Sequence, residues 1–292
     1  KCTLPAEQAI LHSLTAEIYT KYYQSNQWKI NQRTDLNGYL PDDMKEWTKN
    51  IFFDKITRHL QLSVVNQSLL QKTDVMEFSD ILLTGNDSRL LQPALYDLLA
   101  YRRIELLQEI ATASNEKNPL DNDGIFLPAA GFLNYRNDTI YKNSVQNQIV
   151  ETFQQLLLFR MSENNTPALI HADLQRLKYM KENTEIQNAD SLYFNALNVL
   201  EEKYAANEFV VEVLDEKVNY LMSHSELAEN KKRAYEICVD AITKFPHYQR
   251  INHLKNIQKS ILQKNIQINY NNFQGPGESL KINLSTQNIK TI

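Results

Sequence analysis

An aromatic cluster near the N-terminus contains the side chains best suited to recognition. Tyr19, Tyr22, Tyr23 and Trp28 surround a polar stretch at 24–27. Aromatic rings in such a cluster can stack on a sugar or hold a partner peptide. The same rings would instead pack against neighbouring elements if they lie at the end of an amphipathic helix, which is the more common situation. We therefore treat the four residues as candidate partner-binding residues, with packing as the alternative.

The histidines and the acidic runs do not form a pattern that holds a metal ion. No two histidines lie four residues apart, the spacing that lets two imidazoles share a metal ion on one helix face. The run at 120–124 is similar to part of a calcium loop, but Pro119 and Ala130 occupy the first and last ligand positions. An Asx turn explains this run better. The sequence therefore predicts no metal and no cofactor. The histidines are His12, His59, His171, His224, His247 and His253.

The sequence also contains no recognisable catalytic motif. It has no glycine-rich phosphate loop and no G-x-S-x-G turn, and neither cysteine lies in an evidently electropositive setting. Carboxylates such as Glu201, Glu202, Asp215 and Glu216 fall on the polar faces of expected helices, where solvated ion pairs are common. The sequence therefore predicts a protein that is not an enzyme.

Composition favours a helical protein. The 292 residues include only 6 glycines, and 42% are hydrophobic. The formal charge of -4 and the absence of a basic stripe argue against nucleic acid as a partner. No stretch approaches the roughly 20 apolar residues of a membrane span. Cys2 and Cys238 cannot form a disulfide framework, and Cys238 is expected to be a buried structural residue.

The elements that must position these residues are mostly amphipathic helices. The stretch 207–246 predicts two antiparallel helices, because apolar residues recur at helical spacing on both sides of the polar turn 224–230. The first stripe is Val210, Leu214, Val218 and Leu221, and the second is Ala234, Cys238, Ala241 and Phe245. The second stripe, with Pro246, also matches the spacing of a tetratricopeptide repeat, whereas the first helix fits that repeat poorly.

Further helices are predicted on both sides of this hairpin. The segment 6–28 carries Leu11, Leu14, Ile18 and Tyr22 on one face. A helix that begins near Pro93 is apolar nearly all round and should be central in its bundle. Beyond about residue 264 the pattern alternates, which predicts two strands separated by a turn at 273–278. The alternating residues are Ile266, Ile268, Tyr270, Leu280, Ile282 and Leu284.

These patterns predict a mainly α fold, an α-solenoid or tetratricopeptide-like array of antiparallel helix hairpins with a short C-terminal β segment. Prolines and glycines interrupt the middle of the chain, which suggests a boundary there. The expected organisation is an N-terminal helical unit at 1–113, a long ordered connection at 114–142, a tetratricopeptide-like helical unit at 143–265 and a strand pair at 266–292.

Several blocks of the chain resemble the helical N-terminal region of large bacterial alpha-2-macroglobulin-like proteins. The first block runs from Ala9 to Tyr19 and continues to Thr34, and the next ones are 70–73, 95–100 and 126–130. The tail at 280–288 looks like the opening of the first macroglobulin-type β-sandwich. The thioester motif and the bait segment of that family belong to later domains, so no functional residue is transferred from it.

The resemblance implies an exported protein of the periplasm or the cell surface, whose whole chain traps or inhibits proteases. Its partners would be downstream domains of the same chain or another envelope protein, and the signal segment would lie outside these residues. A stand-alone tetratricopeptide-like adaptor and a helical glycan-binding protein that uses the aromatic cluster are the alternatives.

Overall fold

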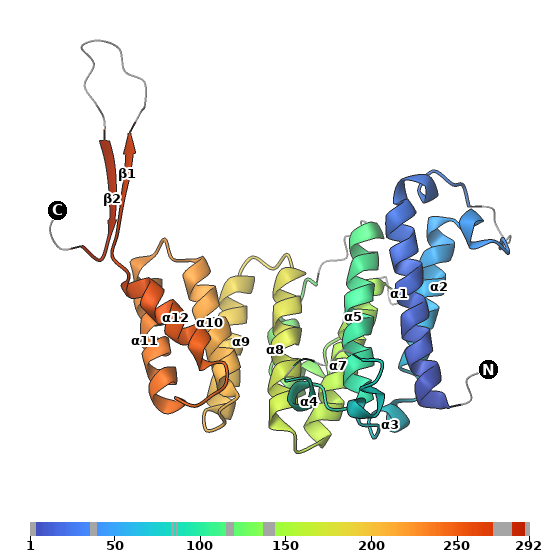
Figure 1. Cartoon of the computed structure of the whole chain (residues 1–292), viewed down its shortest axis with the longest axis horizontal. Coiled ribbons are helices and arrows are strands. Elements are labelled where there is room, and N and C mark those ends of the chain that lie inside the picture. The colour runs from blue at the N-terminus through green and yellow to red at the C-terminus, as the bar shows by residue number, and fades with distance from the viewer. Residues whose placement is uncertain are drawn as a thin grey trace, which may run out of the picture. The chain divides into compact units, whose positions relative to one another are not determined.

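The computed structural model describes residues 4–35, 40–82, 85, 87–114, 120–136, 144–270 and 282–289. Within them the chain is mainly α-helical and ends in a short antiparallel strand pair, as the sequence predicts (Figure 1). Whether the helices form a solenoid stays a prediction. Cys2, Leu280 and the predicted turn at 273–278 lie outside the described residues.

The chain divides into two compact units, Lys1–Ala196 and Leu197–Ile292. The division falls within helix α9 (Ala189–Tyr204), so it does not coincide with the boundary expected at 114–142. Both α5 (Leu95–Ser114), which precedes that connection, and α7 (Val145–Ser162), which follows it, belong to the first unit and pack against each other. A contact between two apolar helices outweighs the local sequence signal of a linker.

The first unit contains long helices joined by short helical segments. Its long helices are α1 (Pro5–Ile30), α2 (Lys49–Ser63), α5, α7 and α8 (Thr166–Glu182). The short α-helices are α3 (Gln67–Leu70), α4 (Ser88–Leu91) and α6 (Ala129–Phe132), and the 3-10 turns are η1 (Met44–Glu46), η2 (Val75–Phe78) and η3 (Asp123–Phe126).

Helix α1 buries a face of small residues and not its leucine stripe. Leu11, Leu14 and Ile18 are 51%, 42% and 61% exposed. The opposite side is buried against α2 and α5, because small side chains let neighbouring helix backbones approach closely. Helical periodicity therefore finds the stripe correctly, but it does not tell which face of α1 meets its neighbours. The small buried residues are Ala9, Ser13, Ala16 and Thr20.

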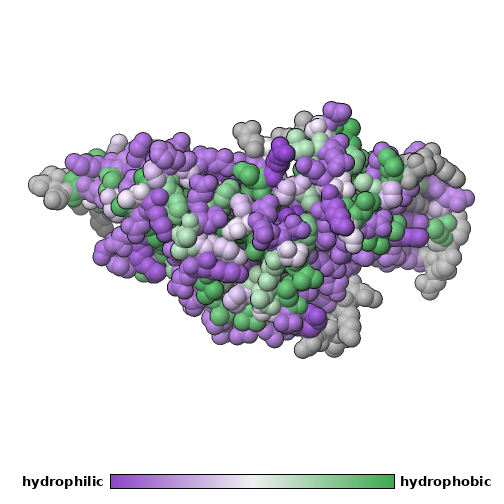
Figure 2. All heavy atoms as spheres, turned by 90° about the horizontal axis from the view of Figure 1, so that it is seen from below, coloured by the Kyte–Doolittle hydropathy of each residue, from purple (hydrophilic) through white to green (hydrophobic). Residues whose placement is uncertain are grey.

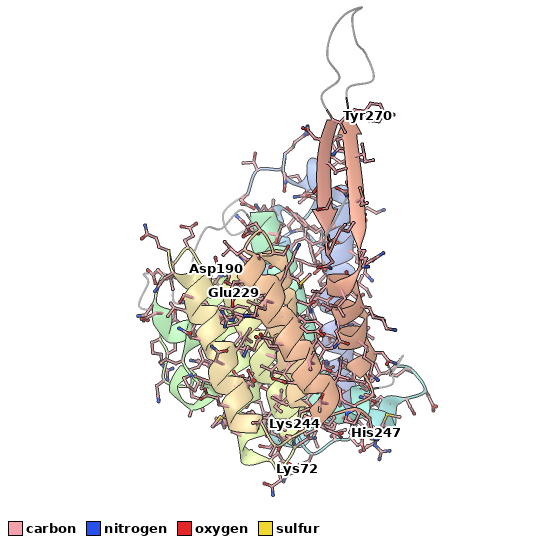
Figure 3. All side chains as sticks on the ribbon, turned by 90° about the vertical axis from the view of Figure 1, so that its left-hand side faces the viewer. Lys72, Asp190, Glu229, Lys244, His247 and Tyr270 are labelled. Carbon is pink, nitrogen blue, oxygen red and sulfur yellow. The ribbon has the colours of Figure 1, made fainter. Side chains whose placement is uncertain are left out.

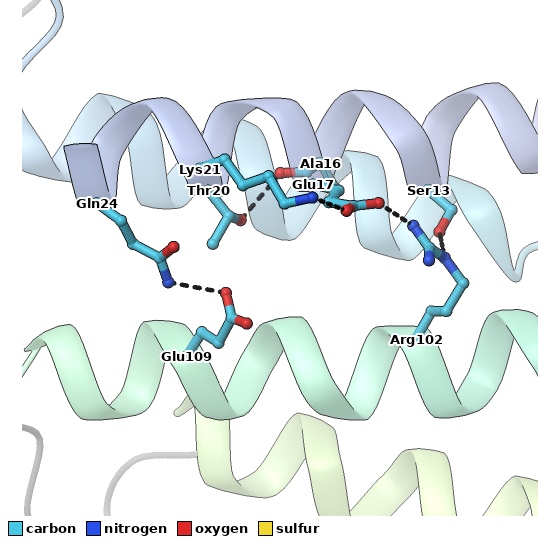
Figure 4. Close-up of polar contacts among 8 residues, drawn as sticks. All are labelled: Ser13, Ala16, Glu17, Thr20, Lys21, Gln24, Arg102 and Glu109. Carbon is cyan, nitrogen blue, oxygen red and sulfur yellow. Dashed lines mark hydrogen bonds and ion pairs between the residues drawn. The ribbon is translucent and has the colours of Figure 1, made fainter. Parts of the chain in front are cut away.

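Polar contacts join α1 to α5 (Figure 4). Arg102 donates from Nε to the hydroxyl of Ser13 at 2.9 Å and forms an ion pair with Glu17. About two turns farther along both helices, the side-chain amide of Gln24 donates to Glu109 at 2.9 Å. Each of these contacts joins a residue of α1 to a residue of α5 more than eighty positions away in the sequence. Together they fix how far one helix is shifted along the other.

Helix α5 lies at the centre of the first unit, as its apolar circumference predicts. It packs against α1, α2, α3 and α7. Its Asp97 forms a bidentate ion pair with Arg160 of α7, with nitrogen–oxygen distances of 2.8 and 2.7 Å, and both side chains are at most 3% exposed. Asp97 also accepts from the backbone amide of Ala94 at 2.9 Å, which caps the start of α5.

The described part of the central connection, residues 120–136, is docked on the helices. Ile125 and Phe132 are fully buried. Arg176 of α8 donates to the carbonyl oxygen of Ile125 at 2.5 Å, pairs with Asp173 and lies over the ring of Phe132. The amide of Gly124 donates to the side chain of Asn122 at 2.8 Å, which is the expected Asx turn.

The second unit contains the predicted hairpin. Helices α10 (Val210–Ser223) and α11 (Ala228–Lys244) pack together, and α12 (Ile251–Leu262) packs against both. The predicted stripes are buried, apart from the partly exposed Phe245. Tyr248 donates to Glu212 of α10 at 2.7 Å, which ties the connection before α12 to the hairpin.

The strands β1 (Asn265–Tyr270) and β2 (Ile282–Gln287) form an antiparallel ribbon. It extends from the C-terminal end of α12 away from α10, α11 and α12 (Figure 1), and Tyr270 lies at its far end (Figure 3). The side-chain amides of Gln287 and Asn288 donate to Ile261 O at 3.3 and 2.6 Å, so the base of the ribbon is attached to α12. Asn288 adopts a φ of 56°, a conformation that asparagine tolerates well.

Candidate functional site

A groove between α5 and α8 in the first unit has a volume of about 450 Å³. Helix α7 lies beneath it, because α7 packs against both α5 and α8. Asp97 pairs with Arg160, and Arg103 bonds to Gln148 at 3.3 Å, so α5 and α7 run antiparallel. A short connection makes α7 and α8 antiparallel in turn. Helices α5 and α8 therefore run in the same direction along the two sides of the groove.

The side chains that line the groove recur at helical spacing on each wall. They come from one face of α5 and one face of α8, with Phe153 contributed by α7 below and Gln92 from the segment before α5. The α5 residues are Tyr101, Ile104, Glu105 and Gln108. The α8 residues are His171, Gln175, Lys178, Tyr179 and Glu182.

The side chains that line the groove differ in burial. Ile104, Phe153 and Tyr179 are buried and form an apolar floor, in which the rings of Phe153 and Tyr179 lie 5.6 Å apart. The glutamine side chains of the walls are half-buried, and Glu105 and Glu182 at the rim are exposed. The groove therefore combines an apolar base, amide walls and an acidic rim.

Tyr101 and His171 face each other across the lining of the groove. Tyr101 packs edge-on against the ring of His171 at 5.4 Å, and its hydroxyl is buried with no hydrogen-bond partner among the described residues. Burial raises the pKa of Tyr101 well above its usual value, so the hydroxyl stays protonated and can donate. The buried Asp97–Arg160 pair lies near it, and burial raises the pKa of Asp97 to about 6 against the opposing effect of Arg160.

The structure places the tyrosines of the aromatic cluster in the packing between α1 and α2. Tyr23 is 2% exposed, and its ring meets Phe53 edge-on at 5.1 Å. Tyr22 stacks on Phe52 at 5.7 Å, and Tyr19 meets the ring of Trp47 at 5.2 Å. These contacts agree with the packing alternative for the three tyrosines.

Trp28 does not share a surface with Tyr19. It is 65% exposed and contacts the ammonium group of its neighbour Lys29 at 5.2 Å. Nine residues, about two and a half helical turns, separate it from Tyr19, so the two side chains point to opposite sides of α1. The structure therefore does not gather the four candidate residues into one binding surface.

Two histidines that are far apart in the sequence meet between α1 and α2. Their Nδ1 atoms, on His12 and His59, lie 2.8 Å apart, and one ring must donate to the other. Burial, followed by the positive charges of His12, Arg58 and Lys55, lowers the pKa of His59. The pair alone supplies two ligands, and no group of three or more histidine, cysteine or acidic residues is arranged to hold a metal ion among the described residues.

The β1–β2 ribbon carries a continuous apolar face. Ile268 is opposite Leu284, and Tyr270 is opposite Ile282, so these side chains and Ile266 project from the same side. All five are between 43% and 58% exposed. The other face carries only amide and hydroxyl side chains, and neither strand contains a charged residue.

The second unit has a more apolar cavity of about 570 Å³ among α9, α10 and α11. Val210, Leu214, Ala241 and Phe245 form much of its wall. Lys244 closes one side by donating to the carbonyl oxygen of Ala205 at 2.6 Å.

The face shown in Figure 2 mixes polar and apolar residues, with no single apolar region that dominates it.

Sequence reasoning missed the groove and the histidine pair. Tyr101 and His171 are separated by 70 positions, and each lies on a helix whose pattern signals only packing. A search for polar residues that repeat along a helix at the edge of its apolar stripe would have selected Gln108 and Gln175. It would not have shown that the two helices face each other.

Comparisons with protein-family models, with curated proteins and with solved structures find no match for this chain. Among the described residues, no helix is both long and apolar enough to cross a membrane.

Proposed function

We propose that this chain is a non-catalytic helical scaffold that binds a β-structured protein partner through the apolar face of the β1–β2 ribbon. The observation that carries the proposal is the exposure of five large apolar side chains on one side of a two-stranded ribbon. Two strands alone are marginally stable in water. A partner surface that covers this face would stabilise both the ribbon and the complex.

The composition of the strands supports a protein partner. Proteins usually protect exposed strand edges with charges, prolines or bulges, and neither β1 nor β2 contains a charge or a proline. An uncharged ribbon offers nothing to a phosphate backbone, but it suits an apolar sheet face and free strand edges that continue its hydrogen bonding. The fitting partner is therefore the apolar face of another β-sheet.

This proposal agrees with the macroglobulin-like resemblance of the sequence. In that family the partner would be a β-sandwich domain farther along the same chain, or a domain of another envelope protein. The whole protein would act outside the cytoplasm as a protease trap or inhibitor, and the helical region would support it without taking part in catalysis. If the complete gene encodes no β-sandwich domains, the family assignment fails. The alternative function, a tetratricopeptide-like adaptor that binds a protein partner, then replaces it.

Hydrogen exchange tests the role of the ribbon. We expect the amides of 265–270 and 282–287 to exchange rapidly in this chain alone and slowly in the complete gene product, because a partner sheet would cover them. Equal and strong protection in both proteins would show that the ribbon needs no partner.

Two substitutions on opposite faces of β1 make a matched comparison. Ile268→Lys places a charge on the apolar face and should remove the added protection in the complete protein. Gln267→Lys places the same charge on the polar face and should leave the protection unchanged. Loss of protection in both variants would point to a general effect of charge on the strand and contradict docking by the apolar face.

A further inference from the structure

The exposed face of α1 has the spacing of a contact between two helices. Its residues follow one another at alternating intervals of three and four positions, as in the seam of a coiled coil. The face lies opposite the small residues that meet α2 and α5, and each of its apolar side chains is more than 40% exposed. We call this face the α1 seam. Its residues are Leu4, Glu7, Leu11, Leu14, Ile18 and Lys21.

The charged residues of the α1 seam are placed symmetrically about Leu14. Glu7 lies seven positions before Leu14, and Lys21 lies seven positions after it. If two copies of α1 run antiparallel with a two-fold axis at Leu14, Glu7 of each copy lies beside Lys21 of the other. The same arrangement brings Leu11 of each copy beside Ile18 of the other. A parallel pair would instead bring like charges together, which is unfavourable.

Lys21 can form this contact although it already has a partner. It pairs with Glu17 on the surface of α1, and Glu17 also pairs with Arg102 of α5 (Figure 4). Arg102 therefore continues to neutralise Glu17 when Lys21 turns toward Glu7 of a second copy. Because exposed ion pairs contribute little to stability, this exchange of partners costs little.

The α1 seam suits a helix better than a membrane surface. A helix that lies on anionic lipids carries several lysines and arginines beside its apolar face. The α1 seam contains one acidic and one basic residue, so it has no net charge to attract such lipids. Its narrow apolar stripe is typical of contact with one other helix. The two-fold symmetry of its charges identifies that helix as α1 of a second copy.

We propose that the α1 seam joins two copies of this chain in an antiparallel, two-fold symmetric dimer. The contact is isologous, because the same residues of both copies meet each other. From Leu4 to Lys21 the α1 seam is about 26 Å long, at 1.5 Å per helical residue. An interface of this size forms a weak dimer. The contact is separate from the β1–β2 ribbon and does not depend on the proposed scaffold function.

Sedimentation velocity at protein concentrations from about 2 to 200 μM tests the proposal. We expect the chain to change from monomer to dimer over this range. Leu11→Ser with Ile18→Ser should keep it monomeric, because the apolar contacts are lost, and the exposure of both side chains means that the fold is retained. A monomer at every concentration in the unaltered chain would overturn the proposal.

A matched pair of substitutions on the ribbon separates this dimer from association through the ribbon. Ile268→Ser with Leu284→Ser removes two exposed apolar side chains from the ribbon and should leave the dimer unchanged. Loss of the dimer in this variant would assign self-association to the ribbon and contradict a contact through the α1 seam.

Charge reversal tests the antiparallel direction. Lys21→Glu places two carboxylates beside each other and should raise the dimer dissociation constant at least tenfold. Adding Glu7→Lys restores opposite charges and should return the constant to within about threefold of its original value. A double variant that dimerises as weakly as Lys21→Glu alone would contradict the pairing of Glu7 with Lys21.

A control variant separates this pairing from an effect of net charge. Lys232→Glu makes the same change of charge at an exposed position of α11 and should leave the dissociation constant unchanged. Equal weakening by Lys232→Glu and Lys21→Glu would show that the net charge of the chain, and not the α1 seam, determines dimerisation. Helical circular dichroism of each variant verifies that the chain is folded.

Discussion

The contact between His12 and His59 makes the stability of the first unit depend on pH. The hydrogen bond between the rings requires a neutral acceptor nitrogen, and burial with the nearby positive charges lowers the pKa of His59. The unfolded chain, in which a histidine titrates near 6.5, then binds more protons than the folded chain over the interval between the two pKa values. The contribution of neutral His59 to the folding stability is therefore fully present above about pH 6.5. It is lost as the pH falls through the lower, folded-state pKa of His59.

We expect urea unfolding at pH 5 to need less denaturant than at pH 7.5. Both tryptophans, Trp28 and Trp47, belong to the first unit, so intrinsic fluorescence reports the unit that contains the histidine pair. His12→Gln with His59→Gln should reduce the pH dependence, whereas His247→Gln, a change at an exposed histidine, should retain it. An unchanged dependence in the double variant would assign the effect to other groups.

The buried Asp97–Arg160 pair leads to a second prediction at this scale. Arg160→Met leaves the carboxylate of Asp97 buried without its cation, which should cost roughly 3–5 kcal/mol of unfolding free energy. Adding Asp97→Asn removes the isolated charge but keeps an acceptor for the amide of Ala94, so it should restore much of that loss. Urea titrations followed by tryptophan fluorescence measure both variants.

The surface pair between Lys21 and Glu17 provides the matched control for the buried one. Lys21 is 70% exposed, and Lys21→Met should change stability by less than about 1 kcal/mol. Similar losses in the buried and exposed cases would mean that burial does not govern the strength of the Asp97–Arg160 contact.

At the scale of elements, helix α11 depends on a buried cysteine. Cys238 is fully buried on the same stripe as Ala234 and Ala241. Cys238→Ser would bury a hydroxyl in this apolar setting and should destabilise the second unit by roughly 1–3 kcal/mol, measured by circular dichroism. Cys238→Ala, which adds no polar group, separates the effect of the hydroxyl from the loss of volume.

The same cysteine should react slowly with thiol reagents. Burial, with a smaller contribution from Asp215, raises the pKa of the Cys238 thiol to about 11, so little of the reactive thiolate forms at neutral pH. We expect mass spectrometry of a maleimide-treated sample to show rapid modification of Cys238 only in urea. Rapid modification of the native protein would contradict its burial and reopen a redox role.

The helices themselves were largely predictable, because local spacing determines them. The stripes of α10 and α11 were identified from sequence and are buried. The buried face of α1 was not, since its small residues gave a weaker signal than Leu11, Leu14 and Ile18. Periodicity ranks faces by hydrophobicity, whereas close helix packing also selects for small side chains.

At the scale of the whole molecule, contacts between distant residues could not be predicted. The ion pair of Asp97 with Arg160 and the hydrogen bond of His12 with His59 each join two helices that carry no local signal for the partner. The candidate groove has the same origin, because its two walls come from α5 and α8. The mainly α class followed from composition, but the division of the chain within α9 depends on packing that a single sequence does not encode locally.

The base of the β1–β2 ribbon determines how a mechanical load would enter the second unit. The ribbon is joined to α12 covalently through 263–264 and by the side-chain amides of Gln287 and Asn288, which bond to backbone carbonyls at the end of that helix. Six residues of strand give a lever arm of about 20 Å. A sideways force at Tyr270 therefore acts as a torque on the C-terminal turn of α12, where the hydrogen bonds of these two amides oppose it.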